Sequence, residues 1–145
     1  MPNICIIGLG NPGIKYNGTR HNVGKDWVKS IATDHNLSLK SHKKIESTVA
    51  SSTDDKILWG YPDQYVNESG RSIKKIIKTN NFNLEQIIVI HDDLDLPTGS
   101  LKLKIGGGHG GHNGLRSIIS NSGKYFIRVR AVSYTHLTLP TTGVV

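Results

Sequence analysis

Two stretches of the sequence combine histidine, carboxylate and glycine in patterns that could perform chemistry. The segment HDDLDLP begins at His91 and includes Asp92, and KIGGGHGGHNGL covers residues 104–115 with His109 and His112 in HxxH spacing. A histidine beside a carboxylate can take a proton from water near neutral pH, because an unperturbed imidazole has a pKa of about 6.5. The same side chains can also bind a metal ion, so general-base catalysis and metal binding are both open.

A fourth histidine, His21, lies in the sequence TRHN after the first predicted strand. A single loop histidine is usually a solvated surface group, but the loops after the first and central strands can meet at one end of a sheet. An aspartate there would complete a general-base pair, whereas Asp93 and Asp95 are better explained as a solvated acidic turn ahead of Pro97. No Ser or Cys stands in a nucleophile elbow, so water is the expected nucleophile.

The metal interpretation is the weaker one. It would use His91, Asp92, His109 and His112, yet glycines separate the last two histidines and would hold them loosely. The sequence also contains no HExxH-type helix. We therefore expect no metal, and insensitivity to EDTA would exclude this alternative.

The glycine-rich segments do not match nucleotide-binding loops. Residues 104–115 contain six glycines but no GK[ST], which excludes a Walker loop. Gly8, Gly10 and Gly13 fit GxGxxG, but the next apolar helix period starts only near Val23, too late to hold a pyrophosphate. The remaining interpretation of residues 104–115 is a mobile loop that leads into a helix, with Asn113 near the cap position.

The predicted elements would bring these loops to one sheet. Apolar and alternating runs predict strands at 3–9, 45–51, 56–61, 86–91, 101–105 and 125–130, and helical periodicity predicts helices at 23–35, 69–80 and 113–120. A strand at 101–105 that alternates apolar residues with lysine should lie at an edge. We therefore predict a single-domain, three-layer α/β/α fold with a mixed, mostly parallel central sheet.

Composition narrows the class of protein. The chain has 145 residues, a net charge of +7 and a pI near 9.6, which suits one domain with a polyanionic partner such as nucleic acid. Cys5 is the single cysteine, so no internal disulfide can form, as is usual in a reducing cytosol, and its apolar neighbours predict a buried structural thiol. We see no signal peptide and no apolar run long enough to cross a membrane.

Four segments considered together resemble the bacterial peptidyl-tRNA hydrolases. They are GLGNPGIKYNGTRHNVG, YPDQYVNESG, IIVIHDDLDLPTG and LKIGGGHGGHNGLRSI, in this order, and the resemblance covers about residues 3–130. Members of this family cleave the ester between a peptide and the terminal ribose of tRNA. The resemblance implies a cytoplasmic monomer without metal or other cofactor, whose partner is the acceptor end of peptidyl-tRNA and which needs no stable protein partner and no membrane.

The resemblance also implies roles for individual residues. His21 matches the general base, Asp92 the carboxylate that keeps it basic, and Asn11 the residue that separates blocked peptidyl from free aminoacyl substrates. The family positions that contact the tRNA end and the peptide are matched by Tyr16, Tyr65, Asn67 and Asn113. The family positions whose basic groups face tRNA phosphates are matched by Lys104, Arg128 and Arg130. His109 and His112 become residues of a glycine-hinged lid.

The sequence departs from the family pattern in two places. Val66 replaces the methionine usual before the asparagine of YVNESG, which predicts a modest change in pocket shape. The tail at 131–145, AVSYTHLTLPTTGVV, does not resemble the family, so we expect residues 1–130 to form a domain truncated at its C-terminus. The alternative to an active hydrolase is an inactive tRNA-binding remnant caused by the altered tail.

Overall fold

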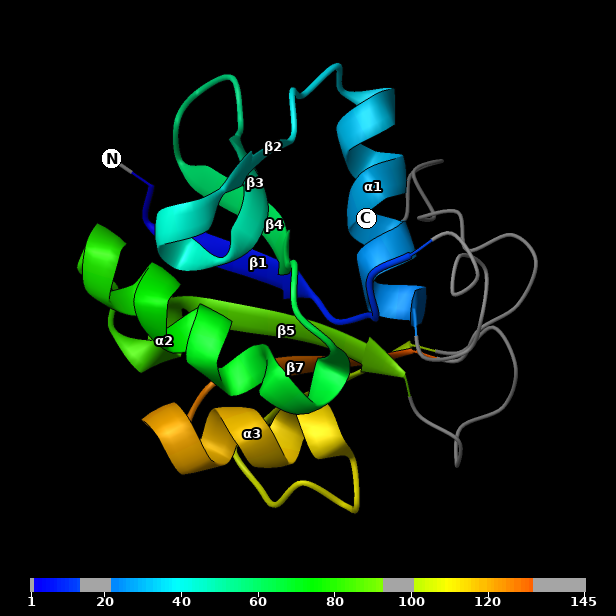
Figure 1. Cartoon of the computed structure of the whole chain (residues 1–145), viewed down its shortest axis with the longest axis vertical. Coiled ribbons are helices and arrows are strands. Elements are labelled where there is room, and N and C mark those ends of the chain that lie inside the picture. The colour runs from blue at the N-terminus through cyan, green and yellow to red at the C-terminus, as the bar shows by residue number, and fades with distance from the viewer. Residues whose placement is uncertain (1, 14–21, 93–100, 132–145) are drawn as a thin grey trace.

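The structure, a computed structural model, describes residues 2–13, 22–92 and 101–131 (Figure 1). The strands are β1 (Ile4–Gly8), β2 (Lys40–His42), β3 (Ser47–Ser51), β4 (Ile57–Pro62), β5 (Ile87–Asp92), β6 (Leu101–Ile105) and β7 (Ile127–Ala131). The α-helices are α1 (Val23–Asp34), α2 (Ser69–Asn80) and α3 (Asn113–Ser122), and short 3-10 turns are η3 (Lys43–Ile45), η4 (Val66–Glu68) and η5 (Leu84–Gln86). None of the helices in these ranges is long and apolar enough to cross a membrane. The tail at 132–145 lies outside the described residues.

The strands form one seven-stranded mixed sheet in the order β2-β3-β4-β1-β5-β7-β6. The four central strands β4, β1, β5 and β7 are parallel to one another. The antiparallel pairings lie toward the two edges, where β2, β3 and β4 pair in turn on one side and β6 pairs with β7 on the other. The predicted class, a single α/β domain around a mixed sheet, is confirmed.

Helices cover both faces of the sheet. In Figure 1, α1 lies on one face, and α2 and α3 lie together on the other. Alternate residues of β1 divide between the two layers, because Cys5 and Ile7 join the core beneath α2 and α3, whereas Ile6 packs with Trp27 and Val28 of α1. Cys5 is fully buried, and burial raises the pKa of its thiol, as the sequence predicted for a structural cysteine.

The first turn of α1 touches the sheet backbone to backbone. Leu9 N donates to Ile90 O at 3.0 Å, and Lys25 N donates to Leu9 O at 3.1 Å. A Cβ on Gly24 would lie 2.1 Å from Ile90 O, so only glycine permits this approach. The contact fixes the start of α1 at the carboxyl ends of β1 and β5.

Differences from the sequence-based boundaries are local. The strand β2 was not predicted, because its three residues are all exposed and polar and show no hydrophobic period. Ile45 belongs to a 3-10 turn instead of the following strand, and Glu46 after it has a φ of 49°. The strand predicted at 56–61 begins one residue later, at Ile57, and ends one residue later, at Pro62, which pairs with Ser47.

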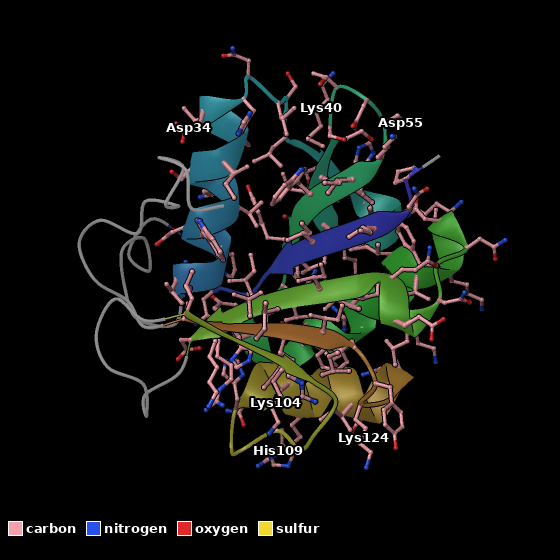
Figure 2. All side chains as sticks on the ribbon, turned by 180° about the vertical axis from the view of Figure 1, so that it is seen from behind. Asp34, Lys40, Asp55, Lys104, His109 and Lys124 are labelled. Carbon is pink, nitrogen blue, oxygen red and sulfur yellow. The ribbon has the colours of Figure 1, made fainter. Side chains whose placement is uncertain are left out.

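The predicted edge strand at 101–105 is confirmed as β6. Leu103 and Ile105 are 70% and 76% exposed, and Lys102 and Lys104 alternate with them. Figure 2, seen from behind, shows Lys104 and His109 at the end of the molecule that carries α3. The glycine-rich loop starts at the amino end of β7, where Ile105 pairs with Ile127, and reaches the carboxyl end of β5 at His112, beside Asp92.

Candidate active site

The carboxyl ends of β1 and β5, the turn η4 and the start of α3 meet at one edge of the sheet. Asn11 follows β1, Val66 opens η4, Asp92 ends β5 and His112 precedes α3. Ligands bind to open α/β sheets at this edge, because the strand ends leave a crevice there. Elements that are distant in the sequence thus deliver polar side chains to one place.

Asp92 and His112 form a close polar pair in this place. The Nε2 atom of His112 lies 2.7 Å from Asp92 Oδ1, and both side chains are largely buried. His112 Nδ1 accepts hydrogen bonds from the backbone N–H groups of Gly114 at 3.0 Å and Leu115 at 3.3 Å. Because Nδ1 is an acceptor, the ring proton is on Nε2, and His112 donates to the carboxylate.

His112 also caps α3, which corrects one sequence-based expectation. Its side chain accepts from the first free N–H groups of the helix, so it is the N-cap residue, and Asn113 is instead the exposed first residue of α3. The sequence suggested a metal ligand or a lid residue at His112, and it did not predict a helix cap there. Its spacing from Asp92 carried no signal, because the contact joins positions 20 residues apart.

A buried amide holds the backbone of Asn11. Asn22, which is fully buried, accepts from Asn11 N at 2.8 Å and donates to Asn11 O at 3.0 Å. The side-chain Oδ1 of Asn11 accepts from Val66 N at 2.8 Å. These bonds define the orientation of the Asn11 amide, whose Nδ2 is therefore the end that can donate to a ligand.

The turn η4 packs against the start of α3. A Cβ on Gly114 would lie 3.0 Å from Val66 Cγ1, 3.0 Å from His112 Cε1 and 2.9 Å from Leu9 Cδ1, so Gly114 lets these side chains converge. Tyr65 and Asn67, on either side of Val66, are exposed.

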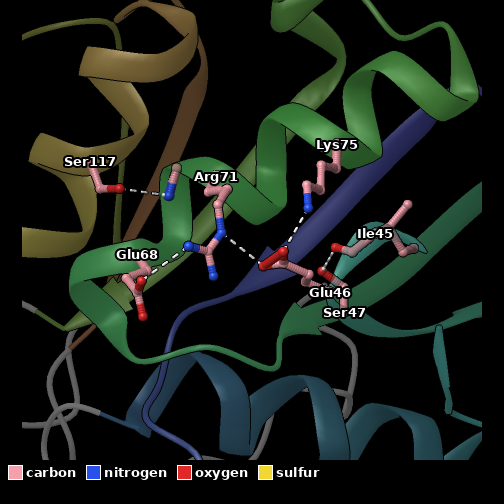
Figure 3. A network of polar contacts seen from close by, with 8 residues as sticks. Ile45, Glu46, Ser47, Glu68, Arg71, Lys75 and Ser117 are labelled. Atoms are coloured by element: carbon pink, nitrogen blue, oxygen red, sulfur yellow. Dashed lines mark hydrogen bonds and ion pairs between the residues drawn. The ribbon is translucent and has the colours of Figure 1, made fainter. Parts of the chain in front are cut away.

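A surface network ties η4 and α2 to the η3–β3 turn (Figure 3). Arg71 donates to Glu46 at 2.9 Å and to Glu68 at 3.2 Å, and Lys75 donates to Glu46 at 2.6 Å. The hydrogen bonds from Lys75 and Arg71 lower the pKa of Glu46. Each of these ion pairs is partly exposed and contributes little to stability.

His91 is buried beside His112. Its Nδ1 donates to the carbonyl oxygen of Asp92 at 2.8 Å, and its ring meets that of His112 edge to face at 5.2 Å between centroids. Burial lowers the pKa of His91 to about 4. His91 is therefore neutral at pH 7 and acts as packing under the site.

This buried histidine predicts a pH dependence of stability. The unfolded chain binds a proton on His91 near its ordinary pKa of 6.5, whereas the folded chain binds it only near pH 4. Between these values the unfolded state carries more protons, so the free energy of unfolding should fall as pH drops from 6.5 to 4, by at most about 3 kcal/mol. Urea unfolding across this range, on the wild type and on His91→Gln, measures it. Equal slopes in the two proteins would remove His91 as the cause.

The three basic residues predicted to face tRNA phosphates lie in different environments. Lys104 is exposed on β6 and Arg130 is partly exposed on β7. Arg128 is only 2% exposed, and its guanidinium donates to the carbonyl oxygens of Gly107 and Gly108. The expectation for Arg128 is corrected, because this buried side chain anchors the glycine loop and does not present its charge to a phosphate.

The histidines considered for a metal site point to other partners. His109 Nδ1 accepts from Gly111 N at 3.0 Å, and both nitrogens of His112 are engaged as described above. Within residues 2–13, 22–92 and 101–131, no group of three or more His, Cys, Asp or Glu side chains is placed to hold a metal ion. His21, Tyr16, Asp93 and Asp95 lie outside these ranges.

Comparison with known proteins gives a consistent result. The family model described as peptidyl-tRNA hydrolase matches residues 5–131. A protein named peptidyl-tRNA hydrolase from Aliarcobacter butzleri is 49% identical over 125 residues, which are 86% of this chain and 67% of the relative. One from Rickettsia canadensis is 44% identical over 88% of this chain and 70% of its own length.

Solved structures agree with the sequence comparison. A crystal structure of peptidyl-tRNA hydrolase from Acinetobacter baumannii has a TM-score of 0.84 and 37% identity, and the match covers 99% of this chain and 75% of that one. A complex of a peptidyl-tRNA hydrolase with N-propanol has a TM-score of 0.83 and 40% identity over 90% and 68% of the two chains.

Proposed function

The chain belongs to the peptidyl-tRNA hydrolase family and hydrolyses peptidyl-tRNA, and on this premise we propose that His21 and Asp92 activate the attacking water. The observation that carries this proposal is the buried Asp92 carboxylate, which accepts a hydrogen bond from His112 at 2.7 Å at the sheet edge that also holds Asn11. Release of the acyl group from an N-blocked aminoacyl-tRNA, measured with EDTA present, tests the activity and its independence of metal. The inactive tRNA-binding alternative is not favoured.

The proposed reaction needs one general base and one ionised carboxylate that is fixed in its orientation. His21 takes a proton from water while the water oxygen attacks the ester carbonyl carbon. Asp92 remains ionised, oriented by the N–H of His112, and stabilises the imidazolium that forms at His21. Collapse of the tetrahedral intermediate breaks the bond to the ribose oxygen, which receives the proton back from His21. The products are the free peptide acid and tRNA.

The start of α3 is the proposed site for the negative charge that develops on the carbonyl oxygen. Asn113 is the exposed first residue of this helix and lies next to His112. A helix N-terminus carries a partial positive charge, and an amide there can donate without a charge of its own. We assign stabilisation of the oxyanion to Asn113 and the adjacent backbone.

Asn11 is the proposed discriminator between peptidyl and aminoacyl substrates. Because Val66 N occupies its Oδ1, Asn11 presents the Nδ2 donor to the substrate. The carbonyl oxygen of a blocked amino group can accept from this donor, whereas the ammonium of a free amino acid offers only donors. The amide orientation therefore favours blocked substrates.

The outward-facing Nδ2 donor of Asn11 predicts how the substitution Asn11→Asp changes substrate preference. An aspartate can still accept from Val66 N, but its second oxygen presents a negative acceptor where the wild type presents a donor. We expect hydrolysis of the blocked substrate to fall by about tenfold or more, and the preference over free aminoacyl-tRNA to shrink or reverse. The ratio of the two kcat/KM values measures this. An unchanged ratio would show that Asn11 does not contact the amino end.

Binding of the tRNA end is assigned to groups around this centre. Tyr65, which is 50% exposed, and the exposed Asn67 are proposed to contact the tRNA end and the peptide, and Tyr16 is proposed for the same task from its sequence position. Lys104 and Arg130 are proposed to meet phosphates, so binding should weaken as salt rises. We further propose a cytoplasmic monomer that needs no cofactor, no membrane and no stable protein partner.

A further inference from the structure

Lys25 is a nearly buried cation next to Asn11, and the proposed mechanism does not use it. Lys25 is 5% exposed, and its Nζ atom donates a hydrogen bond to the backbone oxygen of Asn11 at 3.3 Å. The ammonium also lies over the ring of Tyr61, 4.8 Å from the centroid. The backbone contact between Lys25 and Leu9 fixes the base of this side chain against the end of β1. The charge is therefore held at the backbone of Asn11, the residue proposed to contact the amino end of the substrate.

The surroundings of Lys25 combine both signs of charge. Within the described ranges, Lys29 approaches from α1 and shares the Tyr61 ring at 5.6 Å, while Asp26 on α1 and Asp63 after β4 face the same ammonium. Burial lowers the pKa of Lys25 most, Lys29 lowers it further, and Asp63 and Asp26 raise it. The carboxylate of Asp63 also accepts from Ser41 and Thr48, so part of its charge is directed away from Lys25.

We propose that Lys25 is a specificity-determining residue that disfavours substrates with a free amino group by placing a positive charge against Asn11. The inference rests on the proposed role of Asn11 as the contact for the amino end of the substrate. A free aminoacyl-tRNA carries an α-ammonium there, whereas a peptidyl-tRNA carries a neutral amide. A fixed cation beside this position repels the first and leaves the second unaffected, which is discrimination by an unfavourable contact.

Three substitutions separate charge from packing and hydrogen bonding. Lys25→Met keeps a long side chain but removes its charge. Lys25→Gln also removes the charge but keeps a hydrogen-bond donor for the Asn11 oxygen. Lys25→Arg keeps the positive charge. The measurement is kcat/KM for an N-acetylated and a free aminoacyl-tRNA near pH 6.5, after subtraction of spontaneous ester hydrolysis. Two charges several ångströms apart at the edge of a protein change a ratio of rates by roughly tenfold.

Removal of the charge should lower the preference for the blocked substrate roughly tenfold in both Lys25→Met and Lys25→Gln, and Lys25→Arg should keep the wild-type preference. A purely structural role would lower both rates together and leave their ratio unchanged, and that result would overturn the proposal. If Lys25→Met fails to fold by circular dichroism, Lys25→Gln decides the question.

A pH series gives an independent readout. The α-amino group loses its charge near a pKa of about 7.7–8.0, so the difference in preference between wild type and Lys25→Gln should disappear as pH rises toward 9. A difference that persists at pH 9 would contradict repulsion by the ammonium. Failure of the proposed function is distinguishable, because the wild type would then release nothing from the blocked substrate.

Discussion

Replacement of His21 by alanine is expected to abolish nearly all hydrolysis of a blocked aminoacyl-tRNA. Without the imidazole, water must attack the ester unaided, and loss of a general base of this kind lowers kcat by about 100- to 10,000-fold. Asp92→Asn should show a similar defect, because it removes the charge that stabilises the imidazolium. Binding of tRNA should change little in either variant, since neither residue is proposed to contact phosphate.

The matched control for this experiment is His35→Ala. His35 is an exposed residue at the C-terminal end of α1 and lies away from the sheet edge that holds Asp92. It should keep wild-type turnover, and circular dichroism of all the variants should overlay. Substantial turnover by a folded His21→Ala protein would refute water activation by His21.

The second large effect is expected on stability, from Gly24→Ala. The added Cβ would lie 2.1 Å from Ile90 O and 2.8 Å from Leu9 N, and both are backbone atoms that no change of rotamer can move. Helix α1 would have to leave the sheet, which costs about 3 kcal/mol and outweighs the gain of about 1 kcal/mol from the better helix propensity of alanine. Urea unfolding measures the change.

Gly108→Ala provides the comparison for this prediction. A Cβ on Gly108 would meet no atom within 4 Å, so the same chemical change occurs in open space. We expect its unfolding midpoint to stay close to that of the wild type. If Gly24→Ala unfolds at the same urea concentration as Gly108→Ala, then the close approach of α1 to β5 does not limit stability.

Long periodic segments were predictable from the sequence because one local rule decides them. The helix at 69–80 was predicted with its observed ends, since Ile73 and Ile76 recur on one face and are fully buried. The strand at 86–91 was recognised from its continuous β-branched residues, which suit a strand covered on both faces. The layers and the mixed sheet follow from this alternation of elements.

The features that the sequence did not reveal depend on contacts between distant segments. The cap and carboxylate contacts of His112 require the end of β5 to lie beside the start of α3. Arg128 looked like a surface cation, because nothing local shows that its charge is satisfied by carbonyl oxygens about twenty positions away. The composition and hydrophobic periodicity of a segment indicate which of its residues are buried, but they do not show which distant residues those side chains contact. The roles of His21 and Tyr16 remain predictions from sequence.

The hydrogen bond from Val66 N to Asn11 Oδ1 has a consequence for how the protein becomes active. It joins residues 55 positions apart, and it forms only when the turn after β4 has been brought alongside the end of β1. Closing so long a loop costs chain entropy, so we expect this hydrogen bond to form later in folding than the contacts within single helices. The correct amide orientation is thus a property of the finished sheet. In a refolding experiment, the circular dichroism signal of the helices should therefore return before enzymatic turnover, which requires this hydrogen bond.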